Sequence, residues 1–142
     1  MLRYVATIRS AWSAERAFAY MADLRNASEW DPSVVSATAL DDGPVREGSG
    51  FELRIRSGRR VVPYRYTVTA LEERRITLRA TTRAVDSVDT ITVRDAGTGS
   101  EITYDATLVV KGALVLITPV IARTFRRLGA AAEAQLRLVT SR

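Results

Sequence analysis

The sequence of 142 residues contains neither cysteine nor histidine, and lysine occurs once, as Lys111. Without cysteine, disulfide bonds, thiol catalysis and cysteine-ligated metals are excluded. Without histidine, the chain lacks the commonest general base, the commonest ligand of transition metals and the usual pH-sensing side chain. Ser–His–Asp and zinc hydrolases are therefore excluded, and acid–base chemistry must use carboxylates, tyrosines, the lysine or water. We expect no metal and no cofactor.

Long hydrophobic runs are also absent. The most apolar stretch, residues 112–122, is interrupted by Pro119 and is too short to span a bilayer. The first residues, 1–4, lack the apolar region of a signal peptide. These two features predict a cytoplasmic protein with no stable membrane insertion.

The formal net charge is +5, and all basic residues except Lys111 are arginines. The arginines are spread through every segment and alternate with apolar residues, which is typical of solvated strand and helix faces. We therefore expect no nucleic-acid partner. Size and ordinary composition favour a single domain over residues 1–142. Charges on the expected edge strands disfavour open-ended pairing but leave both a monomer and a homodimer possible.

Alternation of apolar and polar residues with a period of two predicts seven β-strands. Most of them are joined by short turns, for example at Gly58, so a largely antiparallel sheet is expected. In the fourth strand, alternation places Tyr64, Tyr66 and Ala70 on one face. The expected strands cover residues 2–10, 34–40, 50–57, 62–70, 76–80, 89–93 and 102–110.

Three other segments have helical spacing. Ser13 is expected to cap a short helix that runs to about Ala22, and a second short helical piece follows to Trp30. After Gly112, apolar residues recur every three or four positions and predict one long C-terminal helix, which Pro119 either begins or kinks. The apolar stripe of this helix consists of Ile117, Ile121, Phe125, Leu128, Ala132, Leu136 and Val139.

This order of elements predicts an α+β fold. A curved, seven-stranded antiparallel sheet would wrap around the long C-terminal helix, with two short helices after the first strand. One helix crossing a strongly curved sheet does not fill its whole concave side, so we expect an apolar cavity between them. The residues expected to line this cavity and bind a ligand are Trp30, Phe51, Leu53, Tyr64, Tyr66, Leu78, Asp89, Ile91, Tyr104 and Phe125.

Three passages carry a resemblance to a known family. They are Ile8 with residues 13–18, 21–23 and 30–32; the glycine-containing turn and strand of residues 97–104; and residues 111–114 with Pro119. Together they extend over the chain and resemble the START-like superfamily, also called SRPBCC, in particular its bacterial polyketide cyclase/dehydrase-like lipid-transport group. The resemblance implies a helix-grip fold that binds a hydrophobic small molecule. Members of the superfamily include carriers and cyclases, so the fold does not fix a chemistry.

The aromatic residues on the inward faces have two interpretations. Tyr64, Tyr66 and Tyr104 either orient a polyketide, sterol or phenol through their hydroxyls or simply pack in the core. Trp30 either covers one end of the cavity or packs at its rim. Phe125 belongs to the core stripe of the helix in any case, and its contact with a ligand is open.

Asp89 is the only acidic candidate of the site. A lone buried carboxylate is costly unless it is paired. Asp89 is therefore a general base with a raised pKa, or a structural partner of an arginine. A third possibility is that the strand has the opposite register, with Val88, Thr90 and Thr92 inward.

These features leave three functions open. The leading hypothesis is a non-enzymatic module that binds a lipid-like, polyketide-like or aromatic molecule. The alternative is a polyketide aromatase/cyclase or dehydratase acting on a poly-β-ketone, in which Asp89 with a tyrosine or water assists proton transfer. The third is a protein-interaction domain that uses the exposed face of the sheet.

Overall fold

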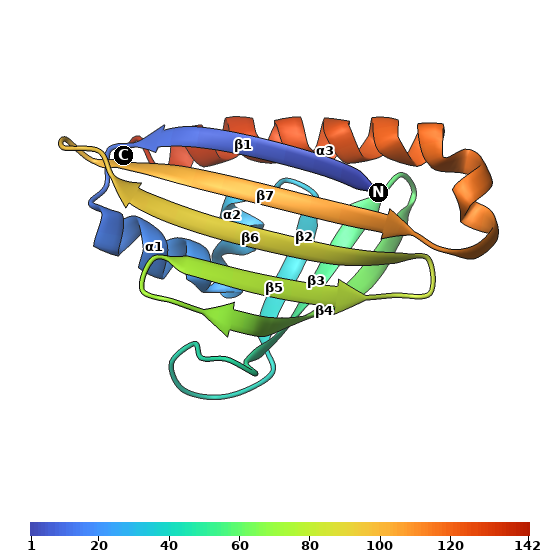
Figure 1. The fold of residues 1–142 in the computed structure, drawn as a ribbon, viewed down its shortest axis with the longest axis horizontal. Helices are drawn as coiled ribbons and strands as arrows, with labels where there is room; N and C mark the ends of the chain where they lie inside the picture. The colour runs from blue at the N-terminus through green and yellow to red at the C-terminus, as the bar shows by residue number, and fades with distance from the viewer.

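In the computed structural model, which describes residues 1–142, one curved sheet wraps around a long C-terminal helix (Figure 1). The strands are β1 (Leu2–Ser10), β2 (Val34–Ala39), β3 (Gly50–Ser57), β4 (Arg60–Leu71), β5 (Arg75–Thr81), β6 (Val85–Asp95) and β7 (Ser100–Val110). The helices are α1 (Ala14–Ala22), α2 (Ala27–Trp30) and α3 (Thr118–Val139), with short 3₁₀ turns η1 (Leu24–Asn26) and η2 (Gly112–Ile117).

The sheet is antiparallel throughout, in the order β1-β7-β6-β5-β4-β3-β2. The first strand pairs with the last, from Leu2 opposite Leu108 to Ser10 opposite Ser100. The remaining neighbours are consecutive in the chain, as expected for strands joined by short turns. The α+β helix-grip prediction is confirmed, including the seven strands and the short helices after β1.

Two predictions made from the sequence pattern were wrong. The register of β4 shifts between Val68 and Ala70, so Ala70 is exposed and Leu71 is half-buried in its place. One extra residue in a strand reverses the alternation beyond it. Ile117 lies in η2 rather than in the helical stripe and is 46% exposed. Pro119 lies in the first turn of α3 and does not kink it, because a missing N–H breaks no helical hydrogen bond there.

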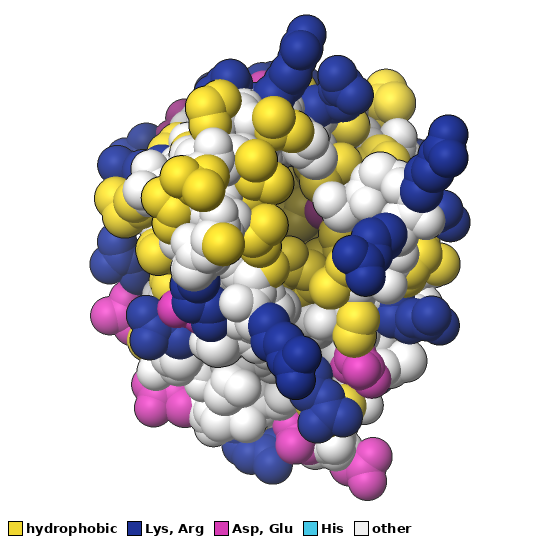
Figure 2. All heavy atoms as spheres, turned by 90° about the vertical axis from the view of Figure 1, so that its right-hand side faces the viewer, with side chains coloured by type: hydrophobic (Ala, Val, Ile, Leu, Met, Phe, Trp, Pro, Cys, Tyr) yellow, Lys and Arg dark blue, Asp and Glu magenta, His cyan; other side chains and the backbone are white.

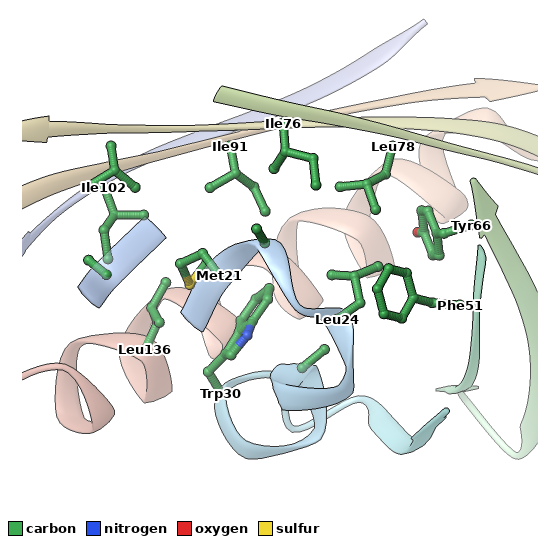
Figure 3. Packing of buried hydrophobic residues seen from close by; sticks show 14 of the residues in the cluster. Met21, Leu24, Trp30, Phe51, Tyr66, Ile76, Leu78, Ile91, Ile102 and Leu136 are labelled. Atoms are coloured by element: carbon green, nitrogen blue, oxygen red, sulfur yellow. The ribbon is translucent and has the colours of Figure 1, made fainter. Parts of the chain in front are cut away.

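The hydrophobic core occupies one part of the concave side of the sheet. Figure 3 shows Ile76, Leu78, Ile91 and Ile102 of the sheet facing Met21, Leu24 and Trp30 of the short helices, with Leu136 of α3 beside them. Ser13 caps α1, since its hydroxyl accepts the N–H of Arg16 at 3.2 Å. Each fully buried Leu or Ile stabilises the fold by about 1.5–3 kcal/mol. The short helices therefore supply much of the cover of the sheet.

Helix α3 is held firmly at its C-terminal end. The N–H of Ala11 donates to the carbonyl of Thr140 at 3.0 Å, and the indole N–H of Trp12 donates to the carbonyl of Arg142 at 3.0 Å. Leu136 is buried in this part of the helix, whereas Ala122 is the one buried residue of its first half. The start of α3 is therefore much less covered than its end. No helix in the structure has the length and hydropathy needed to cross a bilayer.

The corner between β1 and α1 depends on Gly99. Its φ is +93°, and a Cβ added there would lie 2.2 Å from the carbonyl oxygen of Ser10. We expect Gly99→Ala to lower the free energy of unfolding by roughly 3 kcal/mol, measured by urea denaturation. Gly97→Ala is the control, because Gly97 also has a positive φ but nothing within 4 Å, so about 1–2 kcal/mol is expected. Equal losses would contradict the close approach.

Candidate functional site

A cavity of about 470 Å³ lies between the concave face of the sheet and α3. This volume falls in the range of small-molecule sites, roughly 300–1,000 Å³. Of its 30 lining residues, 20 are hydrophobic. Figure 2 views the end of the molecule where η2 joins α3 and shows a hollow surrounded by hydrophobic side chains, with an acidic side chain visible at depth.

The cavity wall is built by strand alternation and by one face of α3. In β6, Val85, Ser87 and Asp89 point inward, and in β7, Tyr104 and Ala106 do so. The alternative register of β6 is therefore wrong, since Val88, Thr90 and Thr92 are on its other face. Strand β1 and α3 add further apolar wall, including Ala6, Ile8, Ile121, Phe125 and Leu128.

A polar group of four side chains lies on this wall. The hydroxyl of Tyr104 donates to Oδ2 of Asp89 at 2.7 Å, and the hydroxyl of Ser87 donates to Oδ1 at 3.4 Å. The Tyr66 hydroxyl lies 3.4 Å from Oγ of Ser87. No arginine or lysine forms an ion pair with Asp89, so its pairing with an arginine is also ruled out. The carboxyl group is satisfied by neutral donors alone.

The electrostatics of this group favour neutral forms. Burial raises the pKa of Asp89 to about 6, against the opposing effect of the hydrogen bonds from Tyr104 and Ser87. The negative charge of Asp31, which also lines the cavity, raises it further. Burial raises the pKa values of Tyr66 and Tyr104 as well, so both phenols stay protonated as hydrogen-bond donors.

Aromatic rings surround the polar group. Trp30 and Tyr104 meet edge to face with their ring centroids 5.5 Å apart, and Tyr64 stacks on Tyr66 at 6.2 Å. The indole N–H of Trp30 is buried without a hydrogen-bond partner in the protein. No group of three or more potential metal-binding side chains occurs in the structure. The wall thus offers flat apolar surfaces beside hydroxyl and carboxyl groups.

Ten residues were expected to line this cavity, and the structure separates them into two groups. The first group, in the cavity wall, is Trp30, Tyr64, Tyr66, Asp89, Tyr104 and Phe125. The second group, in the packed core, is Phe51, Leu53, Leu78 and Ile91, and their placement in the cavity was wrong. These four do face inward, but the short helices pack over that part of the sheet, as Leu24 beside Phe51 in Figure 3 illustrates.

Several lining residues were missed. The ring of Tyr4 lies against α3 where Gly129 leaves room, since a Cβ there would be 2.9 Å from the ring. The Tyr4 hydroxyl donates to Glu133 at 2.8 Å, which ties β1 to α3. Alternation identifies Tyr4 and Ser87 as inward, because Ser87 lies two residues before Asp89. Asp31 follows α2 in a loop, where no periodic signal marks it.

Comparison with solved structures gives the fold. A START superfamily protein from Mycobacterium smegmatis is 16% identical, with a TM-score of 0.72 over 97% of this chain and 99% of that chain. The di-domain ARO/CYC StfQ of the steffimycin biosynthetic pathway is 15% identical, with a TM-score of 0.74 over 98% of this chain and 49% of that one. The major latex-like protein 151 of Panax ginseng is 8% identical, with a TM-score of 0.67 over 97% of this chain and 96% of that one.

Sequence comparison identifies the family. No curated protein sequence matches the chain. The family model described as "polyketide cyclase / dehydrase and lipid transport" matches residues 1–139, which is nearly the whole sequence. The resemblance to the polyketide cyclase/dehydrase-like lipid-transport group is thereby confirmed, and the chain belongs to the polyketide cyclase/dehydrase and lipid transport family.

Proposed function

We propose that the chain binds a hydrophobic or amphipathic small molecule in the cavity between the sheet and α3. The observation that carries this proposal is a largely apolar cavity of about 470 Å³ with a buried, hydrogen-bonded polar group around Asp89 on its wall. Removing apolar ligand surface from water supplies roughly 25 cal/mol per Å². The Asp89 carboxyl accepts a hydrogen bond from a ligand hydroxyl or amine and so orients the molecule.

The cost of burying Asp89 supports a functional role. Below pH 3.8 the carboxyl is protonated in both the folded and the unfolded chain, and above about pH 6 it is ionised in both. Between these values only the unfolded chain loses its proton, so stability falls as pH rises. A pKa raised from 3.8 to about 6 corresponds to at most roughly 3 kcal/mol of lost stability. A residue that reduces stability in this way is typical of a site shaped by function.

Replacing the carboxyl removes this cost. We expect Asp89→Asn to raise the free energy of unfolding at pH 8 by up to about 3 kcal/mol. Weakening of the two hydrogen bonds to the carboxyl group reduces this gain. At pH 4 the gain should disappear. Urea denaturation at both pH values measures the difference.

The matched control for this experiment is Asp105→Asn. Asp105 pairs with Arg3 at 2.7 Å at the surface, which lowers the pKa of its carboxyl. The sign is therefore opposite: its contribution is present at pH 8 and is lost as pH falls. A gain for Asp89→Asn that is equal at pH 4 and pH 8 would show that desolvation of the charge is not its cause.

Filling the cavity tests the binding proposal directly. Ala106 faces the cavity opposite Tyr4 and Asp89 in the neighbouring strands, so Ala106→Trp places a large ring beside the polar group. We expect saturable binding of Nile red, an uncharged lipophilic dye, to weaken at least tenfold, by fluorescence titration. Val109→Trp is the control, because Val109 lies on the exposed face of the same strand. Equal affinities in both variants, with circular dichroism unchanged, would place the dye outside the cavity.

A second candidate function is cyclisation and dehydration of a poly-β-ketone. The favouring observation is a buried carboxyl with a pKa of about 6, bonded to the hydroxyl of Tyr104. A fold similar to that of the ARO/CYC protein StfQ agrees with it. Asp89 would take a proton from a carbon between two carbonyls, and that carbon would attack a third carbonyl of the same chain. The new alkoxide would take this proton back from Asp89 and become a hydroxyl. Asp89 would then remove the second proton of the attacking carbon and pass it to that hydroxyl, which leaves as water while a carbon–carbon double bond forms.

The same substitution separates the two candidates. If the chain is a cyclase, Asp89→Asn lowers turnover of a poly-β-ketone thioester by roughly 100-fold or more, because the amide does not accept the proton. Binding of Nile red should change only a few-fold, since the cavity keeps its shape. Product analysis by mass spectrometry gives the turnover. Unchanged turnover would remove Asp89 from any reaction.

A further inference from the structure

One short segment of the chain has apolar side chains that the fold leaves uncovered. Five large hydrophobic residues of η2 and the first turn of α3 are exposed, with Leu116 at 86% and Val120 at 64%. Two of the five, Leu114 and Val120, also line the cavity, so apolar surface continues from the outside into the cavity. The full set is Leu114, Val115, Leu116, Ile117 and Val120, and we call it the apolar tip.

Basic side chains surround the apolar tip. The chain has no acidic residue from 106 to 132, and this stretch carries Arg123, Arg126 and Arg127. Two turns of the sheet open at the same end. The β3–β4 turn carries Arg59, and Arg60 follows it as the first residue of β4 and lines the cavity together with Leu114. The β5–β6 turn carries Arg83, and the carbonyl of Ala84 in this turn accepts the N–H of Lys111, which precedes η2.

The six arginines named above are available to bind a negatively charged partner. None of the six arginines forms an ion pair, and the nearby Asp86 is already paired with Lys111 at 3.1 Å. All six arginines are exposed. Figure 2 shows this end of the molecule, with hydrophobic side chains beside the hollow and basic side chains around them.

We propose that this end of the molecule docks on the surface of a bilayer that contains anionic lipids. The apolar tip enters the boundary between headgroups and acyl chains, and the surrounding arginines contact the headgroup phosphates. This is a peripheral contact and needs no membrane-spanning helix. The mouth of the cavity then faces the bilayer, so an apolar ligand passes between membrane and cavity without crossing water.

Charge complementarity favours a bilayer over a second copy of the chain. Two copies that met through their apolar tips would bring two sets of unpaired arginines together, and like charges in contact oppose association. An anionic lipid surface instead supplies negative charge around an apolar interior. The inference goes beyond small-molecule binding, because it concerns where the ligand is exchanged.

Vesicle co-sedimentation of the ligand-free protein tests the proposal. We expect binding to vesicles of equal parts phosphatidylcholine and phosphatidylglycerol, weakening as salt is raised, and little binding to phosphatidylcholine alone. Leu116→Ser combined with Val120→Ser should weaken binding at least tenfold. Arg123→Gln combined with Arg127→Gln should weaken it about fivefold for each charge.

Two control variants keep the same chemistry elsewhere. Leu138→Ser changes a side chain that is 61% exposed in the last turn of the same helix. Arg65→Gln with Arg79→Gln removes two charges from the outer face of the sheet. Both should bind vesicles like the unmodified protein, and a loss as large as that of the tip variants would overturn the proposal.

Other outcomes also decide against it. Absence of vesicle binding, or equal binding to neutral and anionic vesicles, contradicts the charge argument. A third outcome is a dimer in sedimentation velocity that is lost in the Leu116 and Val120 variant, with no vesicle binding. This outcome would assign the apolar tip to contact with a second copy. Ala106→Trp should leave vesicle binding intact, so a failure of this proposal is distinguishable from a failure of small-molecule binding in the cavity.

Discussion

The attachment of α3 at only one end is the constraint on which the cavity depends. Hydrogen bonds from Ala11 and Trp12 hold the last turns of the helix against the corner of β1 and α1, and Leu136 is buried there. Since the sheet curves away from this corner, the earlier turns of α3 pass over it at a distance. The short helices fill the space on one side and leave the other open. Tyr4 also ties α3 to β1, through its hydrogen bond to Glu133.

The polar group around Asp89 is positioned by the sheet itself. Tyr104 lies opposite Ile91 in the β6–β7 ladder, and Asp89 lies opposite Ala106, so the tyrosine and the carboxyl are diagonal neighbours on one face. Strand pairing therefore fixes their separation without a loop or a ligand. A site built on paired strands keeps its geometry when empty, which lowers the entropic cost of binding. The stability lost by burying Asp89 is small beside that of the surrounding ladder and core.

Local patterns predicted the elements well and the filling of the concave side poorly. Alternation placed Asp89 and Tyr104 inward correctly, because each lies in a long strand with strict period-two spacing. Phe51 and Ile91 are inward too, yet they lie under the short helices, and no sequence period records where a distant helix docks. The bulge before Ala70 is likewise invisible, because a single extra residue leaves the composition of the strand unchanged. Facing the concave side and lining a cavity are different properties, and only tertiary packing separates them.

The two ends of the cavity differ in chemistry, and this difference limits which ligands suit it. Val85, the first residue of β6, pairs with Val110 near η2 and the mouth of the cavity. Asp89 lies four residues further along β6. An amphipathic ligand that follows this gradient places its polar end inward and its apolar end toward Leu114 and Val120. Asp89 is only 6% exposed, so a bulky charged headgroup beside it would lose its hydration. The hydroxyl donors near Asp89 do not offset that cost. For the small-molecule binding proposed above, the arrangement therefore favours a mostly apolar molecule with one small polar group, such as a hydroxyl, over a phospholipid.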